Sequence, residues 1–556
     1  MTKKTKLELT WPGKEERPKL EPRILIEDPA KSYHASVRRE GDAFDNMLIK
    51  GDNLLALKAL EQDYQGKVKC VFIDPPYNTG SAFPQYDDGL EHSLWLSLMR
   101  DRLEIIKRLL AEEGSLWVTL DDNEVHYFKV MCDEVFGRSN FVADVTWHKR
   151  VSPANDAKYF SADADHILVY ARQKDSWKPN RLTRSEAQTS YYKNLDNDPR
   201  GPWNSSAYTC AKSAEERPNL YYAIVNPHTK EEIWPSKTRV WAYGPETHAR
   251  NVEENLVYWG RDGRGTMPRI KKFLSETKLV VPRSIWPHEE AGHNQESKIE
   301  IERLFPGAPF ATPKPERLLK KVAEIATNPG DLVLDSFAGS GTTGAVAHKM
   351  GRRWIMVEIG DHADTHILPR MQKVIDGSDQ GGISKAVDWK GGGGFRYFTL
   401  APSLLEQDKY GNWVIAQDYN PAMLAEAMCK HMGFTYAPAQ DPAEYWRHGH
   451  STETDFIYVT TQALTHDACA KIAHDVGPDR SLLICCKAYD AAADAFENLT
   501  LVKIPTAILQ KCEWGRDDYS LNIQNLPMAE DDEAAEAAAQ AGGAGLPLFG
   551  GEAGDD

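Results

Sequence analysis

Two stretches of the sequence alternate short apolar runs with amphipathic helical patterns, and this alternation constrains the fold more than any other feature. In the first stretch, helical patterns at 54–64 and 93–113 separate the apolar runs Met47 to Lys50, Val68 to Ile73 and Ser115 to Leu120. In the second stretch, a helical pattern at 313–326 precedes the apolar runs Asp331 to Asp335 and Arg353 to Glu358. Strands that alternate with helices form a parallel sheet covered by helices on both faces. We therefore predict one α/β domain made from two separated halves.

The segment between these halves has a different character. From about residue 176 to 310 the helical period disappears, and Pro, Gly, Trp and Tyr recur instead. This pattern predicts an inserted, loop-rich α+β region at 176–310, which could begin as early as 145. The remaining expectations are an extended N-terminal arm (1–45), the two halves (46–175 and 311–385), a flexible linker at Gly391 to Gly394, a C-terminal α+β domain (395–527) and a disordered acidic tail (528–556).

Charge is distributed unevenly along the chain. The 66 basic and 82 acidic residues give a net charge of -16, and eight of the acidic residues lie after position 528. Residues 145–310 contain 25 basic and 21 acidic residues and seven of the 15 tryptophans. A basic, aromatic-rich region suits a polyanion such as nucleic acid, although an aromatic core with a solvated surface would explain the same composition.

Several protein classes are disfavoured by composition. The eight cysteines are scattered, without a CxxC pair or zinc-ligand spacing, so we expect reduced thiols and no metal site. We find no apolar run long enough to span a bilayer and no secretory signal pattern, which favours a soluble, cytoplasmic protein without membrane contact.

A glycine-rich turn follows the apolar run of the second half. Leu332 to Gly344 reads LVLDSFAGSGTTG, and Glu358 ends the next predicted strand about 20 residues later. Glycines let a backbone approach a ligand closely, and a strand-end carboxylate can accept hydrogen bonds from ribose hydroxyls. The turn therefore predicts a nucleotide-like cofactor. Because the spacing also satisfies GxGxxG, a nicotinamide-dependent oxidoreductase stays an alternative, whereas Thr342 and Thr343 replace the Lys-Ser/Thr of a Walker loop.

A second motif ends the strand at Val68 to Ile73. Asp74-Pro75-Pro76-Tyr77 stands where open α/β sheets place ligand-contacting residues. Two prolines stiffen the turn and remove two N–H donors, which leaves carbonyl oxygens as acceptors. The Asp74 carboxylate and the Pro75 carbonyl could accept both hydrogens of a nucleobase amino group, while Tyr77 stacks on the base. This motif beside a nucleotide-type turn favours chemistry on an exocyclic amine.

Together, these two motifs resemble those of the DNA amino-methyltransferases, which transfer a methyl group from S-adenosylmethionine to N6 of adenine or N4 of cytosine. The order, with Asp-Pro-Pro-Tyr first, is similar to the permuted beta class. IDPPYNTG and LDSFAGSGTTGAVA resemble the modification (Mod) subunits of type III restriction-modification systems. The resemblance implies a Rossmann-like, circularly permuted methyltransferase fold, with the catalytic half first and the cofactor half second.

The resemblance also implies roles for individual residues. Asp74, Pro75, Pro76 and Tyr77 would be catalytic, and Asp-Pro-Pro-Tyr favours adenine over cytosine. S-adenosylmethionine would be bound by Asp335, Phe337, Gly339, Ser340, Gly341 and Thr342, with Glu358 at its ribose. Asp52, in IKGDN, would contact the cofactor's adenine, although a helix N-cap explains it as well. Thr312 and Lys314, in TPKP, would contact the methionine end, although Lys314 could be a solvated first-turn lysine.

The substrate implied is an adenine flipped out of double-stranded DNA, at a cost of a few kcal/mol that binding energy must offset. We assign target recognition to the insert on this ground, with Lys149, Arg150, Lys271 and Lys272 as candidate phosphate contacts. The resemblance further implies a restriction or helicase partner and a homodimer or hetero-oligomer. A catalytically silent DNA-recognition subunit and an N4-cytosine enzyme stay as alternatives.

The last 28 residues contain an apolar segment, Leu546 to Phe549 (LPLF), in an acidic surrounding. Exposed apolar anchors on such tails usually mark a partner. LPLF resembles the short C-terminal peptides that dock bacterial replication proteins on the sliding clamp, although it lacks their glutamine. Folding back onto the C-terminal domain is the competing interpretation.

Overall fold

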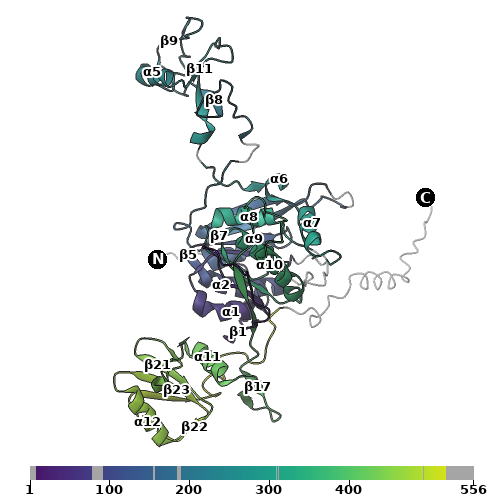
Figure 1. Cartoon of the computed structure of the whole chain (residues 1–556), viewed down its shortest axis with the longest axis vertical. Coiled ribbons are helices and arrows are strands. Elements are labelled where there is room, and N and C mark those ends of the chain that lie inside the picture. Colours follow the sequence, from purple (N-terminus) through teal and green to yellow (C-terminus); the bar gives the residue numbers. More distant parts are fainter. Residues whose placement is uncertain are drawn as a thin grey trace, which may run out of the picture. The chain divides into compact units, whose positions relative to one another are not determined.

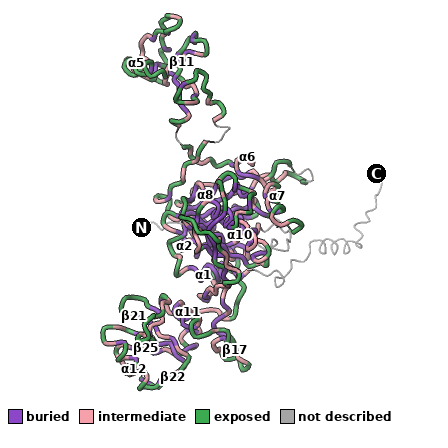
Figure 2. Tube along the Cα trace, in the orientation of Figure 1, coloured by how far each residue is buried: buried purple, intermediate pink, exposed green. Residues whose placement is uncertain are grey.

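The computed structural model describes residues 8–77, 92–153, 157–184, 189–277, 279–308, 310, 312–492 and 494–520 (Figure 1). The chain divides into two compact units: Met1–Lys178 together with Arg283–Asp556, and Pro179–Pro282. Each unit has its own buried residues, and in the first unit they concentrate around a large sheet (Figure 2).

The sheet of the first unit combines strands from both predicted halves. Its order is β1-β16-β3-β15-β14-β4-β5-β7-β6-β13, and β2 pairs with β16. The six strands from β16 to β5 run parallel to one another. From one side to the other, these are Gly394–Leu400 (β16), Asn46–Lys50 (β3), Arg353–Glu358 (β15), Leu332–Asp335 (β14), Val68–Ile73 (β4) and Leu110–Leu120 (β5). The predicted α/β fold with a parallel sheet is confirmed.

Helices follow the strands as the apolar periodicity predicts. In α2 (His92–Leu109), Trp95, Met99, Leu103 and Ile106 recur every three or four residues, and all four are buried in the main core. This spacing places them on one face of a helix, so the face packs inward. The other helices near the sheet are α1 (Asn53–Tyr64), α3 (Val125–Cys132), α8 (Glu316–Ala326), α9 (Thr342–Lys349) and α10 (Leu368–Ile375).

The strand order creates a topological switch point between β14 and β4. From β14 the chain passes through α9 to β15 on one side, and from β4 it passes through α2 to β5 on the other side. The two connections diverge at this point, which opens a crevice outside the carboxyl ends of the strands. Asp335 and Asp74 stand at those two ends.

The N-terminal segment is part of the sheet in the structure, which differs from the extended arm that we predicted. β1 (Leu25–Glu27) pairs antiparallel with β16, and β2 (Tyr33–His34) pairs with the start of the same strand. Trp11 and Ile24 are buried. The short strands carry no clear alternation, which explains why the sequence pattern did not reveal them.

The Gly391 to Gly394 segment is a tight buried turn, and the prediction of a flexible linker there is wrong. All four glycines are buried, and Gly391 and Gly393 have φ values of +85° and +73°. A Cβ at Gly391 would lie 2.7 Å from the Ile375 carbonyl oxygen. Glycine is required here because the turn delivers β16 directly into the sheet beside β3. β16, expected in the C-terminal domain, therefore belongs to the main sheet.

The second unit is shorter than the predicted insert. It contains β8 (Trp203–Ala207), β12 (Arg269–Phe273), β11 (Val257–Tyr258) and α5 (Pro245–Glu253), and its core includes Tyr208, Trp241 and Trp259. On either side, β6 (Phe141–His148), β7 (Ala164–Ala171), β13 (Ile285–Trp286), α6 (His288–Ala291) and α7 (Asn294–Leu304) belong to the first unit. The expected limits, 176–310 or an earlier start near 145, thus extend past the unit on both sides.

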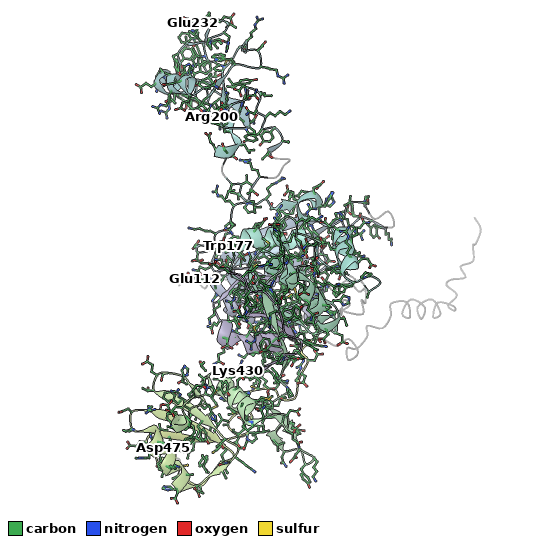
Figure 3. All side chains as sticks on the ribbon, viewed as in Figure 1. Glu112, Trp177, Arg200, Glu232, Lys430 and Asp475 are labelled. Carbon is green, nitrogen blue, oxygen red and sulfur yellow. The ribbon has the colours of Figure 1, made fainter. Side chains whose placement is uncertain are left out.

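The C-terminal part has a small mixed sheet of its own, with five strands. β21 (Asp455–Val459), β23 (Ser481–Cys486) and β25 (Leu499–Lys503) run parallel, with α12 (His466–Val476) between the first two. A second helix, α11 (Pro421–Met432), touches the first half through Lys430, labelled in Figure 3, whose Nζ donates to the Ala59 carbonyl at 3.1 Å.

Further expectations concern the tail, membrane contact and the cysteines. The tail, with Leu546 to Phe549, lies outside the described residues. Within the described part of the chain, no helix is long and apolar enough to cross a membrane. All eight cysteines are free thiols.

Candidate active site

Four carboxylates meet at the carboxyl edge of the sheet. Asp52 follows β3, Glu358 ends β15, Asp335 ends β14 and Asp74 follows β4. Because neighbouring strands are parallel, these ends lie along one edge, as the strand-end argument predicts. Each carboxylate has a different set of partners, and these partners separate the positions that are open to a ligand from those that support the fold.

Asp74 binds two groups that the sequence argument did not pair with it. Its Oδ1 accepts a hydrogen bond of 2.5 Å from the Thr119 hydroxyl near the end of β5, and its Oδ2 forms an ion pair with Lys314. The Asp74 side chain keeps 22% of its surface exposed, so the carboxylate can be approached. The Lys314 ammonium also lies over the Tyr77 ring, 5.1 Å from its centroid.

Tyr77 connects Asp74 to a second ion pair. The Tyr77 hydroxyl donates to Asp165 Oδ2 at 3.4 Å, and Lys149 Nζ donates to Asp165 Oδ1 at 2.5 Å. Burial raises the pKa of Asp165, and burial together with the Asp165 charge raises the pKa of Tyr77 well above its usual range. The phenol therefore stays protonated. Lys149 belongs to this cluster, which leaves it less available for the DNA phosphate contact that we predicted.

The two prolines stiffen the turn, but one of their carbonyls is already used. The Trp95 indole donates to the Pro76 carbonyl at 2.7 Å and holds the turn against α2. Pro75 is buried between Asp74 and Pro76. The Pro76 carbonyl is thus a structural acceptor, and the Asp74 carboxylate is the acceptor exposed to a ligand.

The glycine-rich turn is organised around Asp335. Its carboxylate accepts hydrogen bonds from the Phe337 backbone N–H (2.9 Å) and the Thr343 hydroxyl (2.5 Å). Burial raises the pKa of Asp335 to about 7. Gly341 has φ of +78°, a left-handed conformation that glycine adopts without strain, and it stands immediately before α9.

Glu358 closes the turn from the next strand. Its Oε2 accepts from the Gly339 backbone N–H at 2.8 Å, and its Oε1 accepts from the Gly360 N–H at 3.0 Å. His362 Nε2 lies 3.0 Å from the same Oε1. The carboxylate that we expected at a cofactor ribose therefore also fixes the backbone of the turn.

A buried ionic cluster supports the turn from behind. Arg370 donates to the Ser340 carbonyl (3.1 Å), the Thr342 hydroxyl (2.9 Å) and Glu316 Oε1 (3.0 Å). Lys349 binds both Glu316 oxygens, at 2.8 and 2.9 Å, and Asp379 at 2.7 Å. The four charged side chains are at most 3% exposed. Two cations balance two anions, which is the condition for burying them.

Asp52 acts as a helix N-cap in this structure. Its Oδ1 accepts from the Leu54 and Leu55 N–H groups at 2.9 and 3.0 Å. Its Oδ2 accepts from the Tyr519 N–H at 3.0 Å and lies 3.5 Å from the Arg102 guanidinium. The carboxylate is thus occupied by the chain itself, which fits the N-cap alternative better than an open ligand contact.

A small cavity lies between Asp74 and the glycine-rich turn, with a volume of about 20 Å³. It is lined by Phe72, Asp74, Phe310, Thr312, Lys314, Leu319, Asp335, Phe337, Ala338, Gly339, Ser340, Thr342 and Thr343. Eight of these residues are ones that we predicted as site residues: Asp74, Thr312, Lys314, Asp335, Phe337, Gly339, Ser340 and Thr342. The volume holds about one water molecule, so a larger ligand requires side chains to move.

The remaining predicted DNA contacts are placed differently from one another. Arg150 and Lys272 are exposed. Lys271 is 2% exposed and forms ion pairs with Asp196 and, at 3.3 Å, with Asp198 inside the second unit. Our prediction that Lys271 contacts phosphate is not supported by this placement, because its charge is already neutralised in the core of that unit.

Sequence reasoning missed Thr119, Asp165, Trp95 and Arg370. Thr119 stands near the end of β5, so the strand-end rule could have identified it. Asp165 lies near the start of β7, which runs antiparallel to β5 and brings it to the same edge. Trp95 and Arg370 are on helices, at positions that a periodic pattern marks as core.

Comparison with known proteins gives a consistent picture. A family model described as a DNA methylase (N6_N4_Mtase) matches residues 68–367, more than half of the chain. The chain is 30% identical over 412 residues to the probable type III restriction-modification enzyme HindVI Mod subunit of Haemophilus influenzae, covering 65% of this chain and 55% of that protein. It is 34% identical over 328 residues to the StyLTI Mod subunit of Salmonella typhimurium, covering 54% and 49%. The chain thus spans about half the length of these relatives.

Among solved structures, the chain is matched to the PvuII DNA methyltransferase (cytosine-N4-specific), which is 15% identical to it. The match covers 64% of this chain and 94% of that chain, with a TM-score of 0.34.

Proposed function

This chain belongs to the N6/N4 DNA methylase family, and we propose that it transfers a methyl group from S-adenosylmethionine to N6 of adenine in double-stranded DNA. The observation that carries the proposal is the placement of Asp74 and Tyr77 at the sheet's switch point, beside the glycine-rich turn. An acceptor carboxylate and an aromatic ring are the two groups that an amino-bearing base requires. Asp rather than Ser before Pro-Pro-Tyr favours adenine over cytosine.

The residues around the cavity fit the cofactor. Lys314 supplies a cation for a carboxylate, Ser340 and Thr342 supply hydroxyls, and Phe337 supplies an apolar surface. Gly339, with φ of +54°, brings backbone to the cavity wall. This donor set matches a molecule that combines an amino-acid end with a nucleoside. S-adenosylmethionine supplies the electrophilic methyl group when bound.

The chain's own residues prepare the amine. The Asp74 carboxylate accepts its hydrogen bonds and directs the nitrogen lone pair outward, and Thr119 keeps that carboxylate in one orientation. Tyr77 stacks on the base, and the Tyr77 hydroxyl is held by its hydrogen bond to Asp165. Amines conjugated to a purine are weak nucleophiles, so positioning and fixed hydrogen-bond acceptors supply most of the rate.

We assign target recognition to the second unit, Pro179–Pro282. It has 16 basic and 12 acidic residues, so it is positive in a chain whose net charge is -16. Positive charge attracts the DNA backbone, and the contacts must offset the cost of flipping a base. Lys272 in this unit and Arg150 in the first unit are the proposed phosphate contacts that remain.

At the level of the cell, we propose a modification subunit of a bacterial restriction system that acts on DNA in the cytoplasm with a restriction or helicase partner. Two similar proteins are Mod subunits of such systems. The same similarity fits a silent recognition subunit, but a complete Asp-Pro-Pro-Tyr motif beside the turn argues against it. A nicotinamide-dependent oxidoreductase would leave that motif without a role.

Single-molecule sequencing of DNA from cells that express the chain tests this proposal. Wild type should give N6-methyladenine at one sequence context, and Asp74→Asn should give none. A modified cytosine would favour the N4-cytosine alternative. Unmodified DNA from cells with soluble, folded wild type would favour the silent subunit.

A further inference from the structure

We propose that Lys314 exchanges between two carboxylates: that of Asp74, as observed here, and that of the bound cofactor's amino-acid end. The proposal rests on the methyltransferase function. In this view Lys314 is a positioning residue that blocks the base-binding groups until the cofactor binds, so the cofactor must bind before the base is captured.

Lys314 occupies both groups that would hold the base. Its ammonium is paired with the Asp74 carboxylate and lies over the Tyr77 ring at 5.1 Å. A base whose amino group donates hydrogen bonds to Asp74 and whose ring stacks on Tyr77 would need the space that the Lys314 ammonium occupies. The lysine therefore mimics the base amine with its own N–H donors.

The cavity also shows why the lysine must move. Its volume is about 20 Å³, and the Lys314 side chain forms part of its wall. Among the described lining residues, Lys314 is the single cation, whereas Asp74 and Asp335 are carboxylates. A ligand carboxylate entering here would meet the like charge of Asp74 unless Lys314 turned toward it.

The chain allows the side chain to move while its backbone stays in place. Lys314 stands between Pro313 and Pro315, both buried, immediately before α8. Proline fixes φ, so the segment is stiff. Lysine carries its charge on a flexible four-carbon stem, which can turn to a second partner without a change in the main chain.

Exchange between two carboxylates has a measurable consequence. When a competing contact holds the binding group, the apparent affinity falls in proportion to the fraction of molecules in which that group is free. If Lys314 is paired with Asp74 in roughly 90% of molecules, removing the Asp74 charge raises cofactor affinity about tenfold. By linkage, bound cofactor raises affinity for the base to the same extent.

The test is a double-mutant cycle measured by calorimetry, with S-adenosylhomocysteine as the probe. Asp74→Asn should bind it about tenfold more tightly than wild type. Lys314→Met should bind it more weakly, and the gain from Asp74→Asn should vanish in the Lys314→Met background. 5′-Methylthioadenosine lacks the amino-acid carboxylate, so its affinity should not respond to Asp74→Asn.

Glu290→Gln is the matched control. Glu290 pairs with Lys321 on α8, at 2.5 Å and with 29% and 10% exposure, outside the cavity lining. Removing the Glu290 charge should leave the affinity for S-adenosylhomocysteine unchanged. The proposed exchange would be refuted if Asp74→Asn bound S-adenosylhomocysteine as tightly as wild type or more weakly. It would also be refuted if Asp74→Asn gave the same gain in affinity in the Lys314→Met background. If wild type binds no S-adenosylhomocysteine, the proposed function fails as well, so the two failures are distinguishable.

Discussion

Replacing Arg370 by methionine tests whether the buried ionic cluster positions the glycine-rich turn. The substitution removes three hydrogen bonds, to the Ser340 carbonyl, the Thr342 hydroxyl and Glu316. Methionine is uncharged and about as long as the aliphatic stem of arginine, so the apolar packing of the stem is largely kept. Glu316 keeps its Lys349 partner, and the net charge of the cluster changes from zero to negative.

The expected magnitude follows from burial. Arg370 is 1% exposed, and removing one partner from a buried ion pair costs about 3–5 kcal/mol. Because Lys349 still neutralises Glu316, we expect the lower end, about 3 kcal/mol of unfolding free energy. Two of the lost contacts hold the turn, so cofactor affinity should fall by about tenfold, equivalent to about 1.4 kcal/mol.

Arg352→Met is the control for a general loss of stability. Arg352 is also buried, but it precedes β15 at the opposite edge of the sheet and donates to the Thr327 hydroxyl, the Thr327 carbonyl and the Met350 carbonyl. Denaturant unfolding and calorimetry should show lower stability for both variants and weaker cofactor binding for Arg370→Met alone. Arg370→Lys should fall between wild type and methionine. Equal cofactor affinity in all four proteins would refute the positioning role.

Three further predictions address other parts of the molecule. Burial raises the pKa of Asp335 to about 7, so between about pH 4 and 7 the folded state holds a proton that the unfolded state has lost. As the pH rises through this range, the free energy of unfolding should therefore fall by up to about 4 kcal/mol more in wild type than in Asp335→Asn. Denaturant unfolding at each pH measures this difference. Tyr77→Phe should keep at least about a third of the methyl-transfer activity, because the hydrogen bond from the hydroxyl to Asp165 is long at 3.4 Å. Tyr77→Ala should lose base stacking worth about 1–3 kcal/mol. An equal loss of activity in both variants would show that the hydroxyl is essential. Lys272→Met should weaken DNA binding and reduce the slope of log affinity against log salt concentration by about one. Lys271 is the buried neighbour, so Lys271→Met should instead lower the thermal stability of the second unit. The reverse pattern would contradict the placement of the two lysines.

The main sheet and its site edge could be predicted because their signals are local. The predicted strands Val68 to Ile73 and Arg353 to Glu358 match β4 and β15 at both ends. Once these strands are known, the strand-end rule places Asp74, Asp335 and Glu358 at one edge. The predicted family is confirmed by the family model, because the motifs that carried the resemblance lie within residues 68–367.

The rest depended on contacts between distant parts of the chain. Gly391 to Gly394 has the composition of a linker, and only the packing of Gly391 against Ile375 and of Gly393 against Ala43 shows that it is a tight turn. Lys271 and Lys272 are adjacent, and no local pattern indicates which one is buried. The partners of Asp74 come from residues 119 and 314, far from it in sequence.

Mass spectrometry of nucleosides after reaction with a deuterated methyl donor tests the central claim most directly. Purified full-length chain, S-adenosylmethionine carrying a CD3 group and bacterial genomic DNA are incubated, and the DNA is digested to nucleosides. The proposed function predicts N6-methyladenine that carries three deuterium atoms, and its absence with Asp74→Asn. Label in N4-methylcytosine, or no label in DNA from a protein that binds both the cofactor and DNA, would contradict it.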